Sequence, residues 1–138
     1  MRSSIALLFL AGFLAGPLMA ATPAPEGARA YILSPADGDT VKSPVTVVFG
    51  LEGMGVAPAG TDKPNTGHHH LLIDVAEVPA AGQPIPADDN HKHFGGGQTQ
   101  VTIDLEPGPH TLQLLLGDMN HVPHDPPVAS DKITVEVK

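Results

Sequence analysis

The chain has 138 residues, with 15 Gly, 15 Pro, eight His, no Cys and no Trp, and its 15 acidic side chains outnumber the seven basic ones. The absence of cysteine excludes a disulfide scaffold and a thiolate metal site. A net charge of −8 argues against a nucleic-acid binder, because phosphate binding needs a clustered Lys/Arg surface. Composition alone does not explain the eight histidines.

Residues 1–20 are predicted to be a signal peptide. Arg2 gives a charged start, and the apolar run from Ile5 to Leu18 is too short to span a bilayer. Cleavage is expected after Ala20. We therefore predict an exported, periplasmic protein without a membrane span, with a flexible mature N-terminus over 21–28 and one domain over 29–138.

The rest of the chain alternates apolar and polar residues between turn signals, which predicts strands. In chain order the expected strands are 29–33, 45–52, 68–75, 100–105, 110–116 and 133–137, and the Pro/Gly-rich connection 76–97 has room for a short edge strand. Such short strands, closely spaced by turns, are typical of an immunoglobulin-like antiparallel β-sandwich of six or seven strands, here without a disulfide. The sequence therefore predicts an all-β fold.

Strand direction predicts where the histidines lie. In such a sandwich the starts of the third and fourth strands and the end of the fifth share one pole. Seven histidines are expected at this histidine pole, whereas His110 is expected at the opposite pole as a hydrogen-bonding corner. In the third strand, His69 is expected to face the core, while His68 and His70 face outward.

A cluster of imidazoles predicts a metal site. The expected ligands are His68, His70, His91, His93, His121 and His124, with Met54, Met119 and His69 as weaker candidates. Copper is favoured over zinc because imidazole binds Cu(II) more strongly than Zn(II), and because the two methionines offer thioethers for Cu(I). Five acidic residues are available to orient the imidazoles, namely Asp74, Asp88, Asp89, Asp118 and Asp125. Metal affinity is expected to fall between about pH 6 and pH 5, where ordinary histidines take up protons.

The predicted function is a periplasmic copper chaperone, buffer or scavenger, with another periplasmic metal-handling protein considered as its partner. A non-metal interaction or pH-sensing module with a structural histidine network is the alternative, and a copper oxidoreductase is a third. No catalytic residue is predicted, since the serines lack a nucleophile-elbow context. Whether two copies pair across the histidine pole stays open.

Four segments also resemble a known family. They are Gly67–Asp74, His91–Thr99, Pro107–Leu114 and His121–Pro127. In these segments the sequence is similar to the bacterial domain of unknown function 4399 family, and the resemblance extends from about Tyr31 to Val137. It implies an exported bacterial protein and assigns no activity.

Overall fold

The computed structural model describes residues 20–138, so all but the last residue of the predicted signal peptide lies outside the described residues. Nine strands and no helix occur in this part of the chain. They are β1 (Arg29–Ser34), β2 (Thr40–Val41), β3 (Val45–Glu52), β4 (Gly55–Val56), β5 (Thr66–Ile73), β6 (His91–His93), β7 (Gln100–Ile103), β8 (Gly108–Gly117) and β9 (Ile133–Val137). Because there is no helix among residues 20–138, no helical segment there could cross a membrane.

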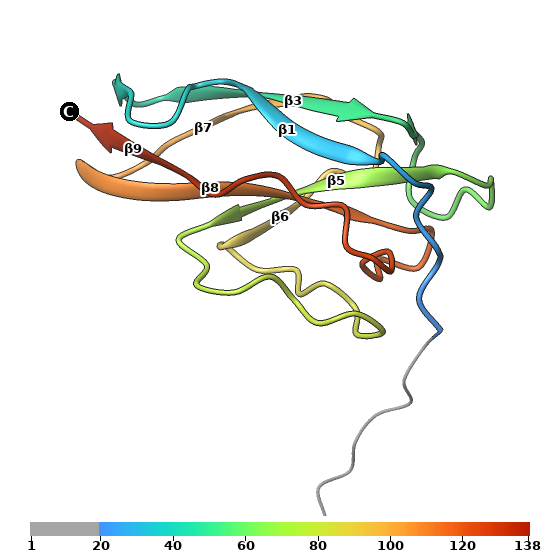
Figure 1. The fold of residues 1–138 in the computed structure, drawn as a ribbon. Helices are drawn as coiled ribbons and strands as arrows, with labels where there is room; N and C mark the ends of the chain where they lie inside the picture. The colour runs from blue at the N-terminus through green and yellow to red at the C-terminus, as the bar shows by residue number, and fades with distance from the viewer. Residues whose placement is uncertain (1–19) are drawn as a thin grey trace, which may run out of the picture.

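The strands form two sheets that face each other (Figure 1). One sheet has the order β1-β3-β7, and the other has the order β2-β9-β8-β5-β4, with β6 added alongside β5. This arrangement confirms the expected all-β sandwich. Two short pairings that sequence patterns did not predict are parallel: β2 with β9, and β4 with β5. The second sheet is therefore mixed.

The main core lies between the two sheets and follows the predicted alternation. Val47, Leu71, Leu112 and Leu114 are completely buried, and Phe49 packs with them. Burying one such leucine contributes roughly 2 kcal/mol. The β5–β8 pairing sets His69 opposite Leu116 and Leu71 opposite Leu114, so these four side chains face the same core.

A second, smaller core lies on the outer face of the β5–β8 sheet. Leu72 and Leu115 are buried there together with Ile85. The alternation of the sequence correctly predicted that Leu72 faces away from the main core, yet Leu72 is only 2% exposed. The reason is the connection between β5 and β6, which lies across this face on the side away from the first sheet (Figure 1). The outer face near the histidines is therefore covered.

The segment before β1 makes defined backbone contacts. Ala24 N donates to the carbonyl oxygen of Asp125, and Asp125 N donates to that of Thr22. Pro23 forms an isolated parallel bridge with Asp125. Residues 22–24 therefore run beside the segment that follows β8.

Candidate metal centre

Four histidines from three separate segments meet on the outer face of the β5–β8 sheet. His68 and His70 come from β5, His93 from β6, and His121 from the loop after β8. Each offers one ring nitrogen, and these four nitrogens all lie within 4.8 Å of one another. We call these four residues the histidine cluster.

Strand alternation and pairing explain how β5 and β6 contribute. His68 and His70 are two residues apart, so their side chains leave β5 on the same face, and their ring centres are 4.8 Å apart. In the antiparallel β5–β6 pairing, His93 lies opposite His70. The ring of His93 is 5.0 Å from that of His68 and 5.2 Å from that of His70.

The loop that carries His121 is built around the carboxylate of Asp118. Its Oδ1 accepts hydrogen bonds from Asn120 N and Val122 N, and its Oδ2 accepts one from Thr22 Oγ1 at 2.7 Å. His121 has a φ of 62°, a left-handed conformation that costs a non-glycine residue about 1 kcal/mol. The loop holds this conformation and brings His121 Nδ1 to 3.1 Å from His68 Nε2.

Two glycines leave room for the imidazoles. A Cβ atom on Gly95 would lie 2.4 Å from Cε1 of His93, and one on Gly117 would lie 2.7 Å from Cε1 of His70. Neither distance is compatible with the observed ring positions. Neither glycine was predicted to belong to the site, because a glycine carries no sequence signal of what packs on it.

Two members of the cluster are strongly desolvated. His68 and His70 are each 1% exposed. Burial, together with the neighbouring histidines, lowers the pKa of His68 to about 4 and that of His70 to about 3. Burial and His121 also lower the pKa of His93. Neutral imidazoles are the metal-binding form, so the fold keeps these three side chains ready for a cation at neutral pH.

The dimensions of the cluster suit a single transition-metal ion. With bonds of about 2.0–2.1 Å, ligand nitrogens lie about 3.3 Å apart in a tetrahedral site and about 4.1 Å apart across a square-planar one. The 3.1 Å between His68 and His121 already fits an edge, and the widest separation of 4.8 Å needs about 0.7 Å of adjustment for a square-planar site and about 1.5 Å for a tetrahedral one. Nδ1 of His70 is buried without any hydrogen-bond partner, which is costly for a purely structural histidine. These four histidines could hold a metal ion.

The other predicted histidine ligands lie outside this cluster. His91 Nδ1 is 2.7 Å from Asp88 Oδ1, in a pair that closes the turn before β6. His124 is completely buried, and neither of its ring nitrogens has a partner. His69 faces the main core, as alternation predicted, with its ring 5.2 Å from that of Phe49. Burial lowers the pKa of His69 to about 4.

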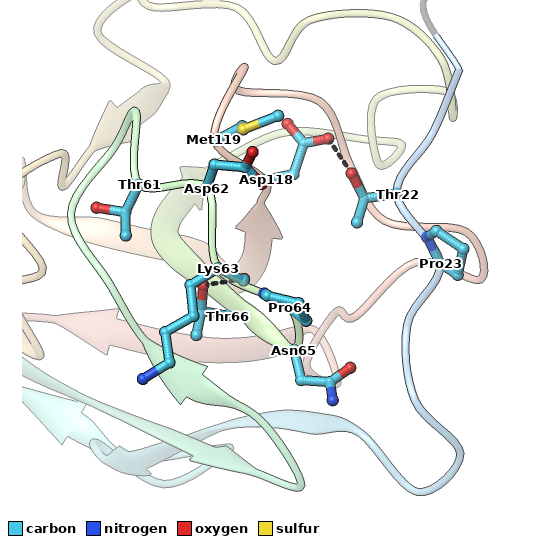
Figure 2. Close-up of a pocket in the computed structure, with 10 residues that line it drawn as sticks. All are labelled: Thr22, Pro23, Thr61, Asp62, Lys63, Pro64, Asn65, Thr66, Asp118 and Met119. Atoms are coloured by element: carbon cyan, nitrogen blue, oxygen red, sulfur yellow. Dashed lines mark hydrogen bonds between the residues drawn. The ribbon is translucent and has the colours of Figure 1, made fainter.

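The two methionines that were weaker candidate ligands, Met54 and Met119, lie outside the histidine cluster. Met54 packs against the main core. Met119 is 37% exposed and lines a separate cavity with Thr22, Asp62 and Asp118 (Figure 2). The geometry of the histidine cluster therefore describes an all-imidazole donor set.

His110 belongs to the opposite pole, as the sequence predicted. Its Nδ1 lies 2.7 Å from Asp74 Oδ2, and its Nε2 lies 2.8 Å from the carbonyl oxygen of Glu106. Both partners are acceptors, so the arrangement suits a doubly protonated imidazolium. The hydrogen bond to Asp74 is the main reason why the pKa of His110 is raised.

A cavity adjoins the histidine cluster. Its lining consists of His70, Pro84, Ile85, Pro86, Ala87, His93 and His121, and its volume is about 150 Å³. Three of the four clustered histidines thus face a small space whose other walls are apolar.

The fold and this site define a two-sheet β-sandwich with a partly buried four-histidine cluster beside its longest connection. The chain belongs to the family described as Domain of unknown function (DUF4399), whose model matches residues 47–138. That range includes all eight histidines. Neither the comparison with curated proteins nor the comparison with solved structures gives a match.

Proposed function

We propose that the protein binds a divalent transition-metal ion through His68, His70, His93 and His121. The observation that supports this most is the convergence of four ring nitrogens within 4.8 Å, contributed by three segments that span more than fifty residues. Electrostatics adds support, because burial and mutual proximity hold the pKa of His68 and His70 near 4 and 3. Protons therefore compete weakly for these ligands at neutral pH.

Copper(II) is the ion we propose, with zinc as the alternative. Nitrogen donors bind Cu(II) more tightly than Ni(II) or Zn(II). Thioether ligands would support binding of Cu(I). Met54 and Met119, however, lie outside the histidine cluster, one against the main core and the other at a separate cavity. The proposal is therefore narrower than the sequence-based one: Cu(II) through imidazole alone.

The biological role we propose is that of a periplasmic copper chaperone, buffer or scavenger. Support for export comes from the charged start and apolar run of residues 1–20. A cluster held partly by the exposed His93 and a surface loop favours reversible loading over a permanently closed site. A pH sensor working near neutrality receives less support, because the lowered pKa values put the protonation of His68 and His70 near pH 4 and below.

Isothermal titration of the metal-stripped protein with Cu(II), Zn(II) and Cu(I) tests the proposal. We expect one Cu(II) ion per chain, bound more tightly than zinc. His93→Ala removes a cluster ligand and should weaken metal binding. His91→Ala is the matched control, because His91 lies in the same strand β6 as His93 but pairs with Asp88 outside the cluster. Affinity no tighter than millimolar for all three ions, or equal losses in the two variants, would refute the proposal.

A further inference from the structure

No carboxylate would bind the metal directly in this site. The cluster contains four imidazoles and no carboxylate. Of the acidic residues close by, Asp118 uses both oxygens to bind Thr22 and the backbone of its own loop, and Asp88 binds His91. The negative charge of Asp118 acts on His68 and would offset part of the charge of a bound divalent ion. The positive charge that remains beside the buried His68 and His70 favours a further counter-charge.

The cavity next to the cluster offers room for that counter-charge. It is lined by His70, His93 and His121, so it borders the position that a shared ion would occupy. Its volume of about 150 Å³ exceeds the roughly 30 Å³ that one water molecule takes up in the liquid, so a triatomic anion fits. The remaining walls, including Pro84 and Ile85, are apolar and would strengthen the attraction between ion and anion by excluding water.

We propose that the metal-loaded protein binds a small inorganic anion in this cavity, as an additional ligand of the metal. The inference rests on the proposed metal function and extends it. Because the cavity borders the position of the ion and the anion is proposed as a ligand of the metal, anion binding should require a loaded site.

Sodium azide is a suitable probe, because coordination of azide to Cu(II) adds a charge-transfer band to the visible spectrum. We expect saturable appearance of this band when the copper-loaded protein is titrated with azide at pH 7, and its loss on dialysis with copper retained. If copper binds but azide leaves the spectrum and the electron paramagnetic resonance signal unchanged, the anion proposal is refuted and the metal proposal stands. If copper does not bind, both are refuted.

Charge changes on the cavity wall test the location of the anion. Ala87 lines the cavity and is exposed, so it tolerates a longer side chain. Ala87→Glu should weaken azide binding about threefold and Ala87→Lys should strengthen it about threefold, as expected for a unit charge about 7 Å away in a water-like dielectric. Ala80→Glu and Ala80→Lys are matched controls in the same connection but outside the lining. Equal effects at the two positions would refute binding in this cavity.

Discussion

Replacing Gly95 with alanine should weaken metal binding while leaving the fold intact. The added Cβ would lie 2.4 Å from Cε1 and 2.8 Å from Nε2 of His93. Ordinary carbon contacts begin at about 3.5 Å, so the imidazole has to move by about 1 Å. His93 is exposed and can turn toward solvent, which takes its nitrogen out of the cluster.

The expected loss is a 10- to 100-fold weaker metal affinity, of the size caused by changes that misplace one ligand. The backbone should not suffer, because Gly95 has no positive φ, and glycine-to-alanine changes at such sites add about 0.4–1 kcal/mol of stability. Isothermal titration measures the affinity, and thermal unfolding of the metal-free protein measures the stability.

Gly96→Ala is the matched control for Gly95→Ala. Its Cβ would meet only the side-chain amide of Gln98, at 3.1 Å, and this flexible group can move aside. The reasoning fails if Gly95→Ala binds the metal within about twofold of the unmodified protein, or if Gly96→Ala loses as much affinity.

Three further predictions concern single side chains. Unfolded His68 takes up a proton near pH 6.5 and folded His68 near pH 4, so His68 alone should lower the free energy of unfolding of the metal-free protein by about 3 kcal/mol as pH falls through this range, in addition to the losses from His69 and His70; urea titrations at several pH values, with His68→Gln showing a smaller drop, measure this. The raised pKa of His110 has the opposite sign: its pairing with Asp74 stabilises the fold fully below pH 6.5 and is lost as pH rises through the raised value, a dependence that His110→Asn should abolish in the same titrations. Thr22→Val removes the hydrogen bond to Asp118 and should lower the free energy of unfolding by about 1 kcal/mol, measured by thermal unfolding. A small loss of metal affinity should accompany it, because the carboxylate of Asp118 supports the His121 loop. Unchanged stability and affinity would show that the N-terminal segment does not support the site.

Much of the fold could be predicted because alternation and turns are local signals. The strands of the main core follow from the inward side chains of 45–51, 112–116 and 133–137, and the outward direction of His68 and His70 follows from their spacing. The second core could not be predicted, because the burial of Leu72 depends on where the connection 76–97 lies. Patterns within a strand carry no information about an irregular segment that covers it.

The sequence predicted six histidine ligands, and the structure brings four of them together. Strand direction predicted seven histidines at one pole, yet ligation requires side chains that point at one another. His91 opens β6 after a turn that pairs it with Asp88, and His124 follows a loop whose path is set by Asp118. Such turns depend on single hydrogen bonds, which composition and spacing do not specify.

The lowered pKa values alter the acid response that the sequence suggested. Ordinary histidines would release a metal between about pH 6 and pH 5. Burial and mutual repulsion move the protonation of His68 and His70 to about pH 4 and 3, so proton competition at these two ligands begins well below pH 6. The same desolvation makes the metal-free cluster costly, because the buried Nδ1 of His70 has no partner. Because neutral imidazole is the metal-binding form, the burial that suppresses protonation also favours the metal.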